Sequence, residues 1–168
     1  NSAWMGRELN KIGVSVKQIT SVSDQAEHII NALNEAQTRA DIILLTGGLG
    51  PTKDDITKLT LSKYFNMPLR QDQETLERVQ NFFQKLNRPM LDVNIKQADV
   101  PDGCEVIQNR NGTAPCMWFD VNGKIFVSMP GVPFEMMYLM EEEILPRLKE
   151  NFDLPYIVHQ TILTVGQG

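Results

Sequence analysis

One short apolar run constrains the fold of this chain more than any other segment. Residues 41–46 read Asp-Ile-Ile-Leu-Leu-Thr, without polar alternation, and a glycine-rich turn follows them directly. A strand with two apolar faces is typical of a sheet that is covered on both sides. Helical patterns flank the run at 26–40 and 56–64. This order predicts right-handed crossover connections and an α/β fold.

Hydrophobic spacing along the rest of the chain predicts further elements of both kinds. Additional helices are expected at 2–12, 76–86 and 133–149, with a short helix within 90–98. Additional strands are expected at 14–22, 105–108, 115–121, 124–129 and 156–165. The Asn122-Gly123 pair predicts a β-hairpin, because both residues tolerate positive φ. We therefore expect a three-layer α/β/α fold with a mostly parallel sheet and one hairpin.

The length of 168 residues fits a single domain over 1–168. The chain opens on a helix pattern, whereas an open parallel sheet is expected to begin with a strand. We therefore predict a first β-strand upstream of Asn1. The chain stops on Gly166-Gln167-Gly168, directly after a strand pattern, and we expect a further domain to follow.

Composition excludes several classes of partner. Sixteen basic against 21 acidic residues give a net charge of −5, which argues against nucleic acid as the main ligand. No window approaches the roughly 18 consecutive apolar residues of a membrane span. Cys104 and Cys116 are the two cysteines, too few for a disulfide framework. We therefore expect a cytoplasmic protein that does not bind membranes.

The glycine-rich turn is the richest candidate site. Thr46, Gly47, Gly48 and Gly50 connect the buried strand to a helix. Such glycines let the backbone approach a ligand closely, and the amides at the following helix N-terminus bind anions. The turn also lies at the carboxyl end of a strand, where open α/β sheets bind ligands. The alternative is a plain strand-to-helix turn.

Two adjacent acids, Asp54 and Asp55, follow this turn. Carboxylates beside a phosphate-binding turn favour a divalent cation between them, and we expect Mg²⁺. Successive helix residues point about 100° apart, so only one of the pair can face a bound phosphate. The alternative is a capping box formed by Thr52 and Asp55. Asp24 has a similar alternative role as the N-cap of the helix that follows it.

A second glycine turn, Pro130-Gly131, follows the last hairpin strand and precedes a helix, which predicts a second anion-binding wall. A polar turn, Asn111-Gly112-Thr113, offers amide and hydroxyl donors. The alternatives are a stiff turn at Gly131 and a simple strand connection at 109–115.

The segment from Leu45 to Thr57 resembles the signature of CinA-like proteins (competence/damage-inducible protein A), within the broader molybdopterin-binding domain family. Four further blocks occur in the order expected for that family: Asn1-Ser2-Ala3-Trp4, Lys96-Gln97-Ala98, Asn111-Gly112-Thr113-Ala114-Pro115 and Pro130-Gly131-Val132-Pro133-Phe134-Glu135-Met136. The resemblance implies an α/β/α fold with its site at the Thr-Gly-Gly-x-Gly loop.

The resemblance also implies an activity. In the molybdopterin relatives the loop binds the pterin phosphate, and the two assisting aspartates match Asp24 and Asp55 here. For the CinA branch it implies hydrolysis of ADP-ribose or a related nucleotide diphosphate, and homo-oligomers are common. Asp55 and Asp24 are then the expected catalytic residues, with Asp55 and Asp54 as metal ligands. The alternatives are molybdopterin binding or adenylyl transfer, and a non-catalytic nucleotide-binding module.

The candidate ligand-binding residues come from the three turns described above. They are Thr46, Gly47, Gly48, Gly50, Thr52, Asn111, Gly112, Thr113, Pro130 and Gly131.

Overall fold

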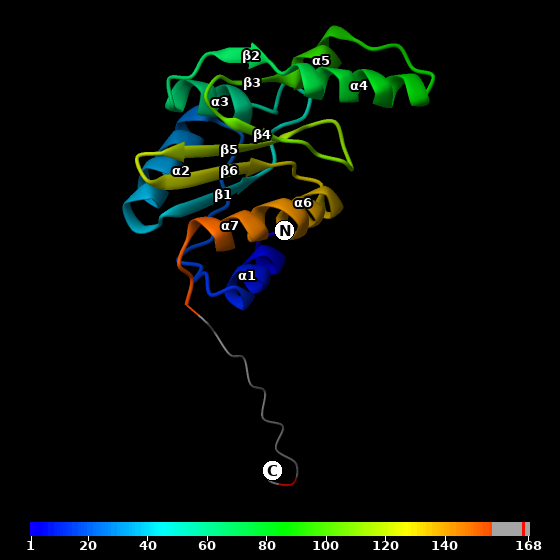
Figure 1. Ribbon diagram of the computed structural model, residues 1–168. Helices are drawn as coiled ribbons and strands as arrows, with labels where there is room; N and C mark the ends of the chain where they lie inside the picture. Colours follow the sequence, from blue (N-terminus) through cyan, green and yellow to red (C-terminus); the bar gives the residue numbers. More distant parts are fainter. Residues whose placement is uncertain (156–165, 167–168) are drawn as a thin grey trace.

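A four-stranded sheet forms the centre of the computed structural model, which describes residues 1–155 and 166 (Figure 1). The strand order is β1 (Ile42–Thr46), β6 (Lys124–Met129), β5 (Cys116–Val121) and β4 (Glu105–Ile107). β1 runs parallel to β6, whereas the β6–β5 and β5–β4 pairs are antiparallel. The described sheet is therefore mixed, with its parallel pair next to the glycine loops. The strand expected at 156–165 lies outside the described residues.

The predicted hairpin joins β5 to β6. Asn122 and Gly123 both have positive φ, at 54° and 73°, and Val121 pairs with Lys124 across the turn. Positive φ at both central residues matches the right-handed twist of the two strands. The hairpin prediction is confirmed.

One face of the sheet is covered by helices from the two ends of the described chain (Figure 1). These are α1 (Ser2–Lys11), α6 (Pro133–Leu139) and α7 (Leu145–Asn151), with a π-helical turn at Met140–Ile144 between the last two. Pro146 lacks an amide hydrogen and its ring crowds the carbonyl one turn earlier, which gives a physical reason for the widened turn. The long helix predicted at 133–149 is confirmed, with its irregularity just before Pro146.

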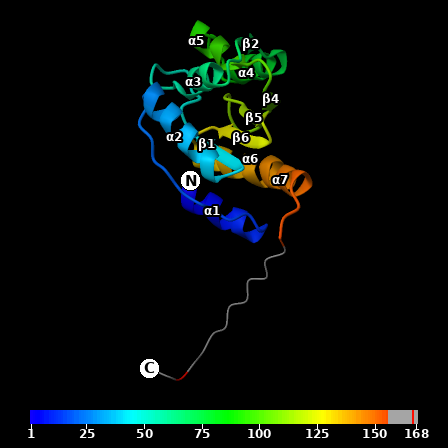
Figure 2. The same cartoon turned by 90° about the vertical axis from the view of Figure 1, so that its left-hand side faces the viewer.

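The other face is covered by α2 (Ala26–Arg39) and α3 (Thr57–Tyr64), as Figure 2 shows from the side. Side chains alternate along the strands, so Phe119 packs toward these helices while Trp118 packs toward α1 and α6. The strands therefore carry apolar side chains on both faces, as the uninterrupted apolar run at 41–46 predicted. The three-layer α/β/α class is confirmed.

Residues 69–101 form a small lobe beyond α3 (Figure 1). The lobe contains β2 (Leu69–Gln71), α4 (Gln73–Lys85), α5 (Asp92–Ile95), a 3₁₀ turn at Lys96–Ala98 and β3 (Asp99–Pro101), and β2 pairs with β3 antiparallel. The sequence indicated the helices but not the strand pair, because three-residue strands are too short for an alternation pattern.

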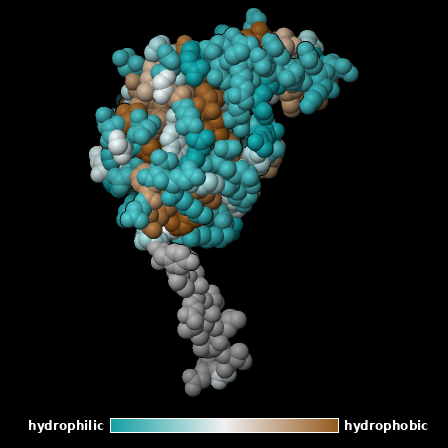
Figure 3. Space-filling model, viewed as in Figure 1, coloured by the Kyte–Doolittle hydropathy of each residue, from teal (hydrophilic) through white to brown (hydrophobic). Residues whose placement is uncertain are grey.

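The strand predicted at 14–22 is wrong. These residues form no regular secondary structure and pair with no strand among the described residues. A cavity of about 370 Å³, the edge cavity, lies between this segment, α1, α2 and β1. Three apolar side chains of the segment stay exposed: Val16, Ile19 and Val22. Figure 3 shows brown, apolar surface on the face of the molecule that it views. The alternating side-chain pattern indicated a strand, but a strand also needs a hydrogen-bonding neighbour.

Within the residues that the structure describes, no helix is both long and apolar enough to cross a membrane.

Candidate functional site

The two glycine turns meet at the carboxyl ends of β1 and β6. The Gly47 amide donates to the Met129 carbonyl at 2.9 Å. A Cβ added to Gly131 would lie 3.2 Å from the Cα of Gly47, closer than side-chain carbons normally approach. The Thr46 hydroxyl donates to the Pro130 carbonyl at 3.0 Å. Glycine at Gly131 therefore lets the two turns form one continuous wall.

Asn1, the N-cap of α1, links the two turns. Its side-chain amide donates to the Gly131 carbonyl at 2.9 Å and to the Thr46 hydroxyl at 3.1 Å. The hydroxyl of Thr46, predicted to contact a ligand, is thus engaged with the two turns themselves. Thr46 lines the edge cavity, and it does not line the second cavity, which is described below.

The first turn wraps around the start of α3. Gly48 has a φ of +70°, and a Cβ at this position would collide with the hydroxyl of Thr57. The Thr57 amide donates to the Gly48 carbonyl at 3.1 Å. Only glycine accommodates this conformation without strain.

A cavity of about 400 Å³, the loop pocket, lies where the turns converge. Seven of the predicted site residues line it: Gly47, Gly48, Gly50, Asp55, Thr113, Pro130 and Gly131. Two polar residues outside the predicted site residues also line it, Gln97 and Glu135, and both belong to the blocks that resemble CinA-like proteins. Both predicted glycine turns and part of the polar turn are therefore brought to one pocket.

Asp55 closes the first turn on itself. Its Oδ2 accepts hydrogen bonds from the Thr52 amide at 2.9 Å and from the Thr52 hydroxyl at 2.5 Å. Burial pushes the pKa of Asp55 upward, but the hydrogen bonds from Thr52 and Gly50 outweigh it and hold that pKa below its usual value. The carboxyl is thus an anion at neutral pH. The bond from the Thr52 amide matches one half of the predicted capping box, but the N-cap of α3 is Ile56 and the helix begins only at Thr57.

The other two predicted aspartates lie elsewhere. Asp54 is exposed and lines neither cavity, and Asp24 is exposed beside the edge cavity. Asp24 is not the N-cap of α2, because that position is Gln25. The structure therefore does not bring Asp24 and Asp55 into one pocket.

The polar turn at 109–114 folds around a buried asparagine. The Asn109 side-chain amide donates to the Ala114 carbonyl at 3.1 Å and to Oε2 of Glu135 at 2.6 Å, and its Oδ1 accepts from the Asn111 amide. Of the three residues predicted here, Thr113 lines the loop pocket, whereas Asn111 is exposed. Gly112 lies directly against the Glu135 carboxylate, with no room for a Cβ.

Glu135 is the acid that sequence reasoning missed. Burial raises the pKa of Glu135, and the hydrogen bond from Asn109 offsets only part of that rise. The available signal was its place in the first turn of a helix after a glycine turn, the same pattern that singled out Asp55. The loop pocket thus holds two carboxyls whose pKa values are shifted in opposite directions.

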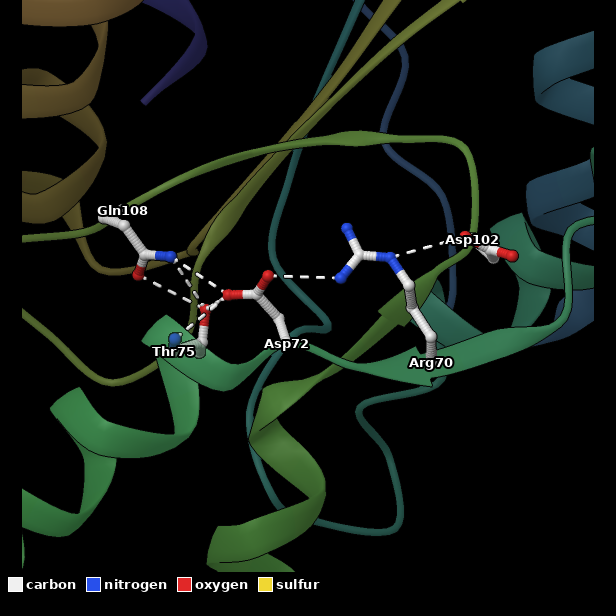
Figure 4. A network of polar contacts seen from close by, with 5 residues as sticks. All are labelled: Arg70, Asp72, Thr75, Asp102 and Gln108. Carbon is white, nitrogen blue, oxygen red and sulfur yellow. Dashed lines mark hydrogen bonds and ion pairs between the residues drawn. The ribbon is translucent and has the colours of Figure 1, made fainter.

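A polar network fixes the lobe beside this pocket (Figure 4). Oδ2 of Asp72 accepts from the amide and hydroxyl of Thr75 and from the Gln108 side chain. Arg70 pairs with Oδ1 of Asp72 at 3.2 Å and with Asp102 at 3.4 Å. Since Gln108 directly precedes the turn at 109–114, the network links α4 to the wall of the loop pocket.

The donor set for a metal ion is sparse. No group of three or more His, Cys, Asp or Glu side chains in the described part of the chain could hold a metal ion. Asp55 and Glu135 therefore do not form a metal site made by protein alone. Mg²⁺, however, is commonly held by one or two carboxylates together with phosphate oxygens and water. The pocket fits an ion only in that mode, shared with a bound phosphate ligand.

Residues 1–150 match the family model that is described as a probable molybdopterin binding domain. The CinA-like protein of Flavobacterium psychrophilum is 46% identical over 169 aligned residues, which cover 100% of this chain and 40% of that protein. The chain thus spans about 40% of the length of this curated relative.

Comparison with solved structures agrees. The protein CinA of unknown function from Thermoplasma acidophilum is 32% identical, with a TM-score of 0.76 over 90% of this chain and 85% of that one. A molybdenum cofactor biosynthesis protein B is 20% identical, with a TM-score of 0.57 over 89% of this chain and 80% of that one. The second likeness concerns the fold alone.

Proposed function

Because this chain belongs to the molybdopterin-binding domain family, and within it to the CinA-like proteins, we propose that it is a nucleotide pyrophosphatase domain. The proposed ligand is ADP-ribose or a related nucleotide diphosphate. One observation carries the proposal: two glycine turns converge on a pocket that also holds Asp55 and Glu135. A backbone cradle suits an anion, and two carboxyls suit acid–base chemistry.

Binding would depend mainly on the main chain. The turns at 47–50 and 130–131 bring peptide groups to the pocket wall, and α3 begins just behind the first of them. Unpaired amides at such a place bind phosphate, and their attraction is strengthened by the helix dipole. A volume of about 400 Å³ falls within the usual range for small-ligand pockets.

The proposed reaction is hydrolysis of the diphosphate. Water attacks one phosphorus, the bond from that phosphorus to the bridging oxygen breaks, and two monophosphates leave. Glu135 is the better general base, because its raised pKa makes it the stronger proton acceptor of the two acids. Asp55 stays charged at neutral pH and, together with the diphosphate oxygens, would hold Mg²⁺. When bound, that ion would neutralise the charge that develops on phosphorus and its oxygens.

The test compares Asp55→Asn and Glu135→Gln in the natural full-length protein. Asparagine and glutamine keep an oxygen acceptor for Thr52 and Asn109, so both turns should fold as before. We expect each variant to hydrolyse ADP-ribose at least about 100-fold more slowly, as loss of an acid–base group usually does. Asp120→Asn and Glu141→Gln, at exposed positions on β5 and the π turn, are matched controls. Undiminished hydrolysis by both site variants would overturn the proposal.

A second candidate is molybdopterin binding or adenylyl transfer. The observation that favours it is the family model itself, which is described as a molybdopterin binding domain. Calorimetry with molybdopterin and ADP-ribose separates the two candidates, since the pocket should prefer its own ligand. ADP-ribose binding without turnover in any divalent metal would instead indicate a non-catalytic nucleotide-binding module.

A further inference from the structure

Gln97 lines the loop pocket, and its side-chain oxygen is an unused hydrogen-bond acceptor within the described part of the chain. The residue belongs to the 3₁₀ turn between α5 and β3, and only 5% of its surface is exposed. Among the described residues, its buried Oε1 has no hydrogen-bond partner. Buried side-chain oxygens almost always have one. Ser128 Oγ is also buried with no partner in the described part of the chain, but it does not line the loop pocket.

The backbone on both sides of Gln97 is fixed by other contacts. The Lys58 ammonium donates to the Lys96 carbonyl at 2.6 Å. The Asp72 amide donates to the Ala98 carbonyl at 2.8 Å. The backbone carbonyls of Lys96 and Ala98 are thus hydrogen-bonded, and these bonds hold the turn in place. The side-chain oxygen of Gln97 has no partner among the described residues. Such an arrangement is expected where the partner is a ligand.

The chemistry of this oxygen determines what it can recognise. A diphosphate carries no hydrogen to donate at neutral pH, so it cannot satisfy an amide oxygen. A sugar hydroxyl or a base amino group can. Gln97 is also neutral, unlike Asp55 and Glu135 in the same pocket. The acceptor therefore suits the uncharged nucleoside portion of a nucleotide, while the glycine turns suit its phosphates.

We propose that Gln97 is a specificity-determining residue whose side-chain oxygen accepts a hydrogen bond from the nucleoside portion of the bound nucleotide. This inference rests on the proposed function, because it assumes that the loop pocket binds a nucleotide diphosphate. It assigns Gln97 a part in choosing the ligand rather than in the reaction.

Calorimetric titration of the natural full-length protein and its Gln97→Met variant tests this inference. Methionine has a similar size but lacks the acceptor. We expect ADP-ribose to bind the variant about tenfold more weakly, the effect of one hydrogen bond left unmade. Gln84→Met, at an exposed position on α4, is the matched control and should bind as the parent does.

Two analogues identify the donor and separate recognition from a structural effect. One lacks the 6-amino group of the adenine, and the other lacks both the 2′- and the 3′-hydroxyl of the adenosine ribose. We expect one of them to bind the parent and Gln97→Met equally well, because the missing donor removes the advantage of the glutamine. An equal loss of affinity for all three ligands would show a structural effect and overturn the inference. Gln97→Asn, which keeps the amide with a shorter reach, provides a second variant for the same comparison.

The outcomes also separate this inference from the proposed function. Binding of ADP-ribose without hydrolysis would overturn the proposed reaction and leave the role of Gln97 to be decided by the titrations. Equal binding of ADP-ribose by the parent and Gln97→Met would overturn the inference alone. Absence of ADP-ribose binding to the parent would overturn both.

Discussion

Glu135 has a raised pKa because the fold partly buries its carboxyl between Asn109 and Gly112. A carboxyl that holds its proton more tightly in the folded protein than in the unfolded chain adds stability below its ordinary pKa of about 4.3. That contribution is lost as the pH rises through the raised value. Ionised Glu135 at neutral pH therefore slightly lowers the free energy of unfolding.

We expect Glu135→Gln to unfold at a higher temperature than the parent at pH 7, and the difference to vanish near pH 4. The gain should stay below about 1 kcal/mol, because water screens a half-exposed carboxylate. Thermal unfolding followed by circular dichroism at several pH values measures it, with Glu141→Gln as the control. If the difference in unfolding temperature grew as the pH was lowered, the raised pKa of Glu135 would be contradicted.

The two cysteines lie in the hydrophobic core on opposite faces of the sheet. Burial raises the pKa of Cys104 to about 11 and raises that of Cys116 as well. Since the thiolate is the reactive form, we expect both thiols to resist a thiol reagent at pH 8 in the folded protein and to react rapidly in urea. Rapid labelling of the folded protein would contradict this burial.

Glycines in the turn and in α1 should respond in opposite ways to alanine. Gly48→Ala forces a side chain into a left-handed conformation against Thr57, and we expect a loss of more than about 1 kcal/mol. Gly6 lies within α1, and an added Cβ there would meet Val16 at an ordinary 3.8 Å. Gly6→Ala should therefore stabilise the protein by roughly 0.5–1 kcal/mol. Urea unfolding of both variants measures the contrast, and equal effects would contradict it.

The start of α4 depends on Asp72. Its side chain accepts from Thr75 as an N-cap and also pairs with Arg70. We expect Asp72→Ala to lower the free energy of unfolding by about 1 kcal/mol, the usual cost of a lost cap. Asp72→Asn keeps the cap without the charge and should lose much less. If both substitutions cost the same, the ion pair with Arg70 and not the cap would be responsible.

The sheet joins the two hydrophobic clusters into one cooperative unit. Trp118 and Phe119 are neighbours on β5, and they belong to the clusters on opposite faces. Neither cluster can come apart without exposing the strands that the other needs. We expect urea unfolding followed by tryptophan fluorescence to coincide with unfolding followed by circular dichroism. Two separated transitions would contradict this coupling.

Much of the fold could be predicted because local patterns and tertiary packing agree in most segments. The apolar run at 41–46 indicated two covered faces, and Asn122-Gly123 indicated the hairpin. The segment 14–22 failed because alternation describes a side-chain pattern and says nothing of a pairing partner. The two strands of the lobe were not predicted because three residues are too few to show an alternation pattern.

The candidate site divides in the same way. Glycine turns at strand ends could be recognised in the sequence, since their spacing reflects backbone conformation. The roles of Gln97 and Glu135 could not, because they depend on which loops the tertiary structure brings together. The separation of Asp24 from the loop pocket was hidden for the same reason.

Four of the residues that line the loop pocket are glycines, which offer a ligand only main-chain polar groups, and mutation seldom removes such groups. The side chains that we propose for the reaction, Asp55 and Glu135, are few and replaceable by comparison. Descendants of one ancestral chain can therefore change what happens to a bound molecule while keeping their hold on it. Proteins that share these glycine turns could therefore diverge into hydrolases, transferases or carriers without changing how they bind the phosphates of a ligand.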